Sequence, residues 1–342
     1  MMSVRTMIER LPPAGFSFVM ATGIVGTSFV AIGLSPIGAV AFVLAVGGYA
    51  LLLIATVARV LLAPAAVLRD AGDPGRAFGF FTIVAATGVT ATLGASLGAE
   101  GILPVALALE ALLWALLTYG MLPWLVTHAS RRPLLRTVDG GWFLLVVATQ
   151  SLSVLTSATA GGHPLLGLAA FALWCLGIVL YLLLMAAVTV RLLGQEIAAI
   201  DVAPTAWVLT GSTAISTLAA ARLLTADSAV LPGTEGAVTV VAMALWSFGT
   251  FLIPFLVGLG IRDLRTRPGA RRFTVGWWSI VFPIGMYATA TIALGRAAGV
   301  GELVAVGTLA VWCGAVAWVL VSILAIGLSV ERLRSNRAAT GG

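Results

Sequence analysis

Ten long apolar segments divide this sequence, and they constrain its fold more than any other feature. A helix needs roughly 20 mostly apolar residues to cross the hydrocarbon core of a bilayer. The segments that meet this requirement are residues 14–32, 37–58, 77–97, 102–126, 142–160, 165–190, 203–221, 237–261, 275–294 and 303–330. Only short breaks separate them, so we predict one transmembrane domain over residues 1–342. The expected fold class is an all-α integral membrane protein with ten transmembrane helices.

The composition agrees with a protein that is surrounded by lipid. Hydrophobic residues make up 60% of the chain and charged residues 9%, whereas a soluble domain carries roughly 25% charged residues. The net charge of +6 could suggest nucleic acid, but the arginines form short clusters between apolar runs. The two cysteines, Cys175 and Cys313, lie in separate apolar segments without metal-ligand spacing. We therefore expect no nucleic-acid partner, no metal and no cofactor.

The placement of arginine predicts how the chain is oriented. In a topology of ten spans, 17 of the 19 basic residues fall on the side that holds both termini, including Arg131, Arg132 and the cluster within residues 262–272. Only Arg222 and Arg296 fall on the other side. Cytoplasmic loops carry the excess of basic residues in membrane proteins. We predict a multi-pass protein of the cell membrane with short cytoplasmic termini and an uncleaved first helix.

A short pattern recurs in the odd-numbered segments. It reads Val-Met-Ala-Thr-Gly at residues 19–23, Val-Ala-Ala-Thr-Gly at 84–88 and Val-Val-Ala-Thr-Gln at 146–150. The seventh and ninth segments carry looser versions, whereas the even-numbered segments consist mostly of Leu, Val and Ala. A recurring unit of this kind indicates an internal repeat, here a helical hairpin used five times.

The repeat predicts five polar inner helices around an axis and five apolar outer helices that face lipid. Hydroxyl groups are stable in a membrane where they meet another helix, their own backbone or water. Threonines at equivalent positions could therefore line a central pore, or they could bond their own helices and pack against small neighbours. We favour the pore. Its candidate lining residues are Thr22, Thr87, Thr149, Gln150, Ser212, Thr213, Pro283 and Thr289.

Three of these segments resemble a known family. Residues 11–25, 141–151 and 278–287 are similar to the first, fifth and ninth helices of tellurite-resistance/C4-dicarboxylate transporter proteins. This family includes TehA proteins, malate permeases, sulfite pumps and slow anion channels. The resemblance covers roughly residues 11–330, and the runs in the fifth and ninth segments are the specific ones.

The resemblance implies five hairpins around a central pore in quasi-fivefold arrangement, assembled as a homotrimer with one pore per subunit. It also implies a phenylalanine that blocks the pore, and the matching residue here is Phe282, in the Phe-Pro-x-Gly run of residues 282–285. The repeat aligns Phe282 with Ala21, Ala86 and Ala148, so a large ring would enter a collar of methyl groups. The alternative is an ordinary core aromatic.

The implied function is membrane transport of small anions, either C4-dicarboxylates such as malate or inorganic anions, in a channel-like manner. An inside-negative potential contributes about 2.3 kcal/mol per charge per 100 mV. It therefore favours export of a dianion by about a thousandfold per 100 mV. The sequence leaves open which anion is carried, and whether the protein is a channel or a coupled transporter.

Glu110 is the only carboxylate deep inside a segment, so it is the candidate for proton coupling in a dicarboxylate, sulfite or tellurite exporter. A structural role at a helix or subunit contact is the favoured reading, because the fourth segment should be an outer helix. An embedded enzyme is a weaker alternative, since His128 and His163 lie in connections at opposite membrane faces. A pure scaffold would not need the repeated hydroxyls.

Overall fold

A computed structural model describes residues 8–128, 134–194, 204–225, 233–266 and 274–340 of the chain. Every regular element in these ranges is a helix. Ten helical spans are long and apolar enough to cross a membrane, which confirms the predicted fold class. Their bounds are Pro13–Ala31, Ser35–Leu62, Ala77–Ser96, Glu100–His128, Gly140–Thr159, Pro164–Leu193, Pro204–Thr225, Glu235–Asp263, Val275–Ala298 and Gly301–Gly327.

Burial separates the spans into two classes. In the odd-numbered spans 72 to 83% of the residues of the most apolar window are buried, against 11 to 28% in the even-numbered spans. The inner helices are α2 (Ser17–Ala31), α5 (Thr82–Ser96), α8 (Leu144–Thr159), α10 (Val208–Thr225) and α12 (Trp278–Ala298). Their outer partners are α3 (Ser35–Leu62), α6 (Leu103–Leu116), α9 (Pro164–Leu193), α11 (Glu235–Thr266) and α13 (Gly301–Thr340). A π-helical stretch (Leu117–Met121) and α7 (Leu122–His128) continue α6.

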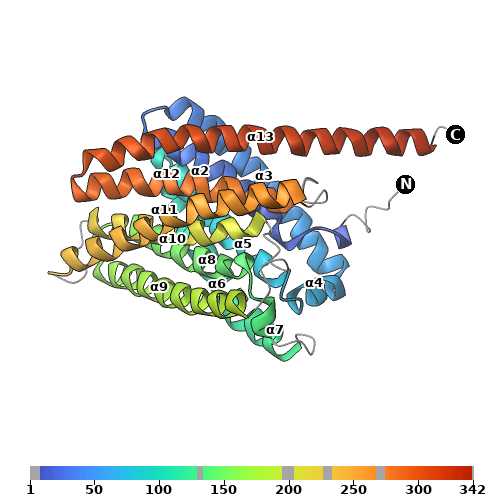
Figure 1. Cartoon of the computed structure of the whole chain (residues 1–342), viewed down its shortest axis with the longest axis horizontal. Helices are drawn as coiled ribbons and strands as arrows, with labels where there is room; N and C mark the ends of the chain where they lie inside the picture. The colour runs from blue at the N-terminus through green and yellow to red at the C-terminus, as the bar shows by residue number, and fades with distance from the viewer. Residues whose placement is uncertain (1–7, 129–133, 195–203, 226–232, 267–273, 341–342) are drawn as a thin grey trace.

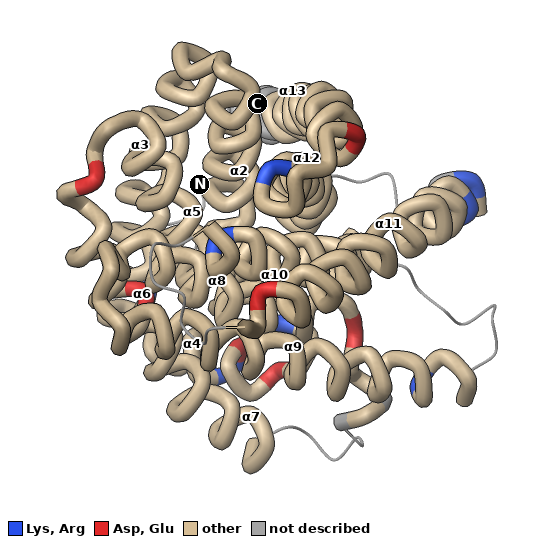
Figure 2. The backbone as a smooth tube through the Cα atoms, turned by 90° about the vertical axis from the view of Figure 1, so that its left-hand side faces the viewer, with Lys and Arg blue, Asp and Glu red and all other residues tan. Residues whose placement is uncertain are grey.

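The inner helices pack against one another in chain order. Helix α2 contacts α5, α5 contacts α8, α8 contacts α10, α10 contacts α12, and α12 returns to α2. Each inner helix also packs against the outer helix that follows it in the chain. The bundle is drawn side-on in Figure 1 and end-on in Figure 2, where the charged residues are few among the helices. Whether a fivefold axis relates the hairpins stays a prediction.

Each inner helix is preceded by a 3-10 turn. These turns are η1 (Pro13–Phe16), η2 (Ala77–Phe81), η6 (Gly140–Phe143), η8 (Pro204–Trp207) and η10 (Val275–Trp277). The turns of neighbouring repeats contact one another, η1 with η2, η2 with η6, η6 with η8, η8 with η10 and η10 with η1. The amino-terminal ends of all five inner helices therefore meet at one end of the bundle.

Most arginines in the described part of the chain lie within helices, and several of them occupy the last turn of a helix. Arg262 and Arg265 lie in the last turns of α11, whereas Arg131, Arg132, Arg267, Arg271 and Arg272 lie outside the described residues, as does residue 203, the predicted start of the seventh span. Beyond the end of its apolar window, α13 continues to Thr340 and projects from the bundle in Figure 1.

Candidate functional site

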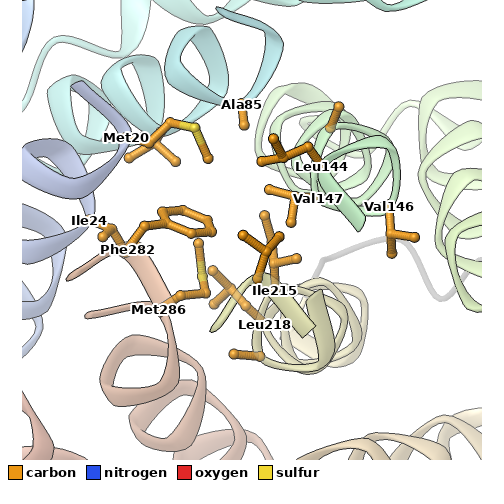
Figure 3. Packing of buried hydrophobic residues seen from close by; sticks show 14 of the residues in the cluster. Met20, Ile24, Ala85, Leu144, Val146, Val147, Ile215, Leu218, Phe282 and Met286 are labelled. Atoms are coloured by element: carbon orange, nitrogen blue, oxygen red, sulfur yellow. The ribbon is translucent and has the colours of Figure 1, made fainter. Parts of the chain in front are cut away.

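An apolar cluster fills the middle of the inner bundle. Figure 3 shows the ring of Phe282 among side chains from all five inner helices. They are Met20 and Ile24 from α2, Ala85 from α5, Leu144 and Val147 from α8, Ile215 and Leu218 from α10, and Met286 from α12. Phe282 is 2% exposed. We call this set of apolar side chains the central plug.

The neighbours of Phe282 differ by one position from the predicted collar. The repeat aligned Phe282 with Ala21, Ala86 and Ala148, yet the side chains that Figure 3 shows around the ring include those of Met20, Ala85 and Val147. A shift of one residue turns a helical position by 100°, since a helix has 3.6 residues per turn. Two of these three side chains, Met20 and Val147, are larger than a methyl group.

Two glycines allow the inner helices to approach each other at the plug. A Cβ atom on Gly211 of α10 would lie 3.0 Å from Pro283 Cγ and 3.5 Å from Phe282 Cδ1. A Cβ atom on Gly285 of α12 would lie 3.0 Å from Ile24 Cγ2. Pro283 lacks the backbone N–H of an ordinary helical residue. It packs against α10 at Gly211.

A cavity of about 350 Å³ lies at the amino-terminal ends of the inner helices. We call it the N-side cavity. Its walls come from every one of the five 3-10 turns or from residues beside them, and they include Arg76 and Asp139. Leu144 belongs both to its lining and to the central plug. The N-side cavity therefore ends at the plug.

The two charged residues of the N-side cavity are held by neighbours. Arg76 Nε lies 3.2 Å from Asp70 Oδ1, and Asp70 also pairs with the buried Arg59 of α3. Burial raises the pKa of Asp139, and its hydrogen bond from the Gly141 N–H and the nearby Arg191 offset only part of that rise. The cavity thus contains a guanidinium group that is paired with a carboxylate, and a carboxyl group that is easier to protonate than usual.

A second cavity, of about 300 Å³, lies at the carboxy-terminal ends of α2, α5, α10 and α12. We call it the C-side cavity. Arg222 and Arg296 line it, together with hydroxyl side chains that include Thr289. Leu218 belongs both to its lining and to the central plug. The plug therefore separates two cavities at opposite ends of the inner bundle.

The repeated threonines do not face this plug, which differs from their predicted role as pore lining. Each of the five outer helices carries one aromatic side chain that hydrogen-bonds to the inner helix of the next hairpin. The pairs are Tyr49 with Thr87 at 2.7 Å, Trp114 with Thr149 at 2.9 Å, Trp174 with the Ser216 carbonyl at 3.0 Å, Trp246 with Thr291 at 2.9 Å, and Trp318 with Thr22 at 3.0 Å. A buried indole N–H needs an acceptor, and in lipid water cannot supply one.

Other predicted lining residues also bond or pack against neighbouring helices. Gln150 Nε2 donates to the Trp174 carbonyl on α9. Ser212 Oγ donates to the Val208 carbonyl and lies 3.3 Å from the Phe143 carbonyl. Thr213 faces α11, where a Cβ atom on Gly249 would collide with its hydroxyl. Of the eight predicted lining residues, Thr289 is the one that borders the C-side cavity.

Comparison with known proteins identifies the family. Residues 10–326 match the voltage-dependent anion channel family. The chain belongs to that family. The match spans nearly all ten helices and confirms the resemblance seen in the sequence. Membership in this anion channel family supports anion transport across a membrane and places the chain in a family of transporters and channels rather than of enzymes.

Two relatives of this chain come from strains of Mycobacterium tuberculosis. Each is described as an uncharacterized membrane protein and is 33% identical over 142 residues. The matched region covers 41% of this chain and 72% of each relative. These matches support a multi-pass membrane protein.

Glu110 lies where the three helices α5, α6 and α8 meet. It is 0% exposed, although it belongs to the outer helix α6. A Cβ atom on Gly88 of α5 would lie 2.6 Å from Glu110 Oε1 and 2.8 Å from Oε2, and it would also collide with Ser151 Oγ of α8. Gly88 therefore makes room for the carboxyl group, which lies outside the linings of both cavities.

One signal in the sequence could have predicted the inner–outer hydrogen bonds. Each even-numbered segment carries an aromatic residue with a polar hydrogen near its middle: Tyr49, Trp114, Trp174, Trp246 and Trp318. The repeated hydroxyls of the odd-numbered segments form the second pattern. The two patterns together would have indicated that the repeated hydroxyls face outward.

Proposed function

We propose that this chain conducts small anions along the axis of the inner bundle and that Phe282 closes the path. The observation that carries the proposal is the pair of cavities at opposite ends of the bundle, with a thin apolar plug between them. Hydrophobic constrictions can gate channels by excluding water. Displacement of one ring would connect the two cavities.

The charges along this axis favour anions. Five helix amino termini, which carry partial positive charge, converge on the N-side cavity. Among the described residues, the C-side cavity is lined by two arginines and by no carboxylate. Along the described inner helices the charged side chains are those of Arg222 and Arg296, which line the C-side cavity. This arrangement supports weak binding at both ends and no tight site between them, as rapid conduction requires.

We further propose that the N-side cavity faces the cytoplasm and that the protein forms a homotrimer in the cell membrane. The excess of arginine on the side of the termini supports this orientation, and the family resemblance supports the trimer. In this orientation the membrane potential favours export of anions. Accessibility to a membrane-impermeant thiol reagent tests the orientation, with Ser35→Cys or Gly75→Cys introduced at exposed positions of a variant that lacks Cys175 and Cys313.

Anion flux into proteoliposomes that contain the purified protein tests the gate. The Phe282→Ala variant removes the ring from the plug and should increase flux of chloride and malate. Phe29→Ala is the matched control, because Phe29 is also buried but packs against Trp312 on an outer helix. We expect the control to lose stability without gaining flux.

Near-zero flux in the wild type and in Phe282→Ala would contradict the proposed pore. Equal flux gains in the Phe282 and Phe29 variants would indicate general loosening instead of a gate. A competition series of malate, succinate, sulfite, tellurite, nitrate and chloride then identifies the preferred anion.

A second candidate function is proton-coupled export of a dicarboxylate, sulfite or tellurite through Glu110. The observation that favours it is the complete burial of this carboxyl group, with no cation paired to it among the described residues. Carboxyl groups inside a membrane are costly and often functional. Since Glu110 borders neither cavity, it would act through the contact of α5, α6 and α8.

The Glu110→Gln variant separates the two candidates. Glutamine keeps the size of the side chain but cannot exchange a proton. A coupled exporter would lose the dependence of flux on a pH gradient, whereas a channel would retain its flux and its pH profile. Normal transport with unchanged pH dependence rules out coupling through Glu110.

A further inference from the structure

The C-side cavity holds the two arginines that break the charge rule of this chain. Of 19 basic residues, Arg222 and Arg296 are the pair that falls on the side opposite the termini. They lie in the last turns of separate inner helices, α10 and α12, yet they line one cavity. An arginine near the carboxy terminus of a helix interacts favourably with the helix dipole, and this alone could explain one such residue. Their convergence on one cavity suggests a second role.

The contacts of the two side chains leave charge available in the cavity. Arg296 Nη2 donates a hydrogen bond of 2.7 Å to the carbonyl of Ala31, at the end of α2. This bond anchors one of five N–H donors of the guanidinium group. Within the described part of the chain, neither Arg222 nor Arg296 forms an ion pair with a carboxylate.

The hydroxyl groups of this cavity cannot neutralise or replace the arginines. Thr27, Ser96 and Thr289 each donate to a carbonyl of their own helix, at 3.0, 2.7 and 3.0 Å. Their protons are therefore committed, and what remains toward the cavity is acceptor capacity. The donors left to meet an anion are the guanidinium N–H groups.

The N-side cavity provides an internal comparison. Its arginine, Arg76, is paired with Asp70 at 3.2 Å, and a second carboxyl group, Asp139, lines the same space. The arginine of the N-side cavity is thus paired with a carboxylate, whereas the two arginines of the C-side cavity have no carboxylate partner among the described residues. With about 300 Å³, the C-side cavity has room for roughly ten water volumes, enough for a small hydrated anion.

We infer that the C-side cavity is a binding site for carboxylates and oxyanions, held by Arg222 and Arg296. The planar guanidinium group donates two parallel hydrogen bonds to a carboxylate or oxyanion, a geometry that a spherical halide cannot use. This inference deepens the proposed function, since it names the preferred class of anion. It requires only binding, however, and binding can be measured without flux.

Thermal unfolding of the full-length protein in detergent provides the test, with malate or chloride added at constant ionic strength. A ligand that binds the folded state raises the midpoint, and at a given concentration the ligand with the lower Kd raises it more. We expect malate to stabilise the wild type more than chloride does. Loss of a charged hydrogen-bond partner should weaken malate binding about tenfold or more in Arg222→Gln and further in the Arg222→Gln/Arg296→Gln double variant.

Two matched variants sharpen the test. Arg69→Gln removes the same charge from an exposed position on the short helix α4 (Pro64–Ala71), and it should bind malate as the wild type does. Arg222→Lys keeps the charge but loses the planar fork, so it should retain anion binding and lose the preference for malate over chloride. Among the described residues, the Arg222 side chain donates no hydrogen bond to the fold, whereas Arg296 bonds to the Ala31 carbonyl, so the Arg222 variants are the less disruptive ones.

Unchanged malate binding in the double variant would overturn the inference, as would an equal loss in Arg69→Gln. Chloride binding as strong as malate binding in the wild type would also overturn it. These outcomes are distinguishable from failure of the proposed pore. If Phe282→Ala increases flux while the arginine variants bind malate normally, the pore stands and the inference fails. If malate binding depends on the arginines but no variant conducts anions, the inference stands and the proposed pore fails.

Discussion

Replacing Thr149 with valine tests whether the repeated hydroxyls join helices or line the path of the anion. Valine keeps the shape of threonine but cannot accept the hydrogen bond that Trp114 Nε1 donates to Thr149 Oγ1 at 2.9 Å. The indole N–H of Trp114 would then lie between two helices without an acceptor. The structure predicts a loss of stability with little change in flux, whereas a pore-lining hydroxyl would give the opposite result.

The expected magnitude follows from the surroundings of this bond. An unsatisfied buried donor costs about 1–3 kcal/mol, while interhelical hydrogen bonds inside membranes average about 0.6 kcal/mol and reach about 1.7. Trp114 is half-buried, so part of the cost is relieved. We expect Thr149→Val to lower the free energy of unfolding by about 1 kcal/mol, or about fivefold in the equilibrium constant.

Chemical unfolding in detergent and flux in proteoliposomes, measured on the same preparations, provide the assay. Thr159→Val is the control, because its hydroxyl bonds only the Leu155 carbonyl of its own helix. A double-mutant cycle with Trp114→Phe should return most of the loss as a coupling energy. A drop in flux of about tenfold with unchanged stability would refute the reasoning and return Thr149 to the pore.

Three further predictions follow from named contacts. Because burial raises the pKa of Asp139, its carboxyl group is neutral below that raised value and negative above it, so anion flux should fall as pH rises on the N side. Asp139→Asn, which retains a capping side chain, should give high flux at every pH; an unaltered pH profile would exclude Asp139 as the cause. Gly140→Ala should prevent folding or cost several kcal/mol, because its Cβ atom would fall on the backbone of Thr205, and a wild-type unfolding midpoint would contradict this contact. Gly47→Ala, where a Cβ atom meets nothing within 4 Å, should instead gain about 0.5–1 kcal/mol in the same measurement.

The sequence predicted the ten spans and their division into inner and outer helices. Apolar length determines which segments cross a membrane, and this requirement is local to each segment. The alternation between polar and apolar segments predicted which helices are buried, and the burial of the odd-numbered spans agrees. Helix ends differ from the predicted ends by a few residues, because caps and 3-10 turns decide them and not hydropathy.

The candidate site could be predicted only in part. The resemblance selected Phe282, and the structure places its ring in the apolar plug between two cavities. It did not indicate Arg222 and Arg296 as a pair, since they lie in segments that are distant in the chain and meet only where α10 and α12 end side by side. Sequence separation hides a convergence of this kind.

The sequence by itself determined that this chain is a ten-helix membrane protein, with buried odd-numbered and exposed even-numbered helices. It did so because the bilayer imposes the same length and polarity on every span. Only the tertiary structure decided which way each buried side chain points. An inner helix is covered on all sides, so no polar stripe marks the axis, and packing turned Thr22, Thr87 and Thr149 toward outer-helix aromatics. The same packing placed apolar side chains at the centre of the inner bundle, and Arg222 and Arg296 at the carboxy-terminal end of the bundle.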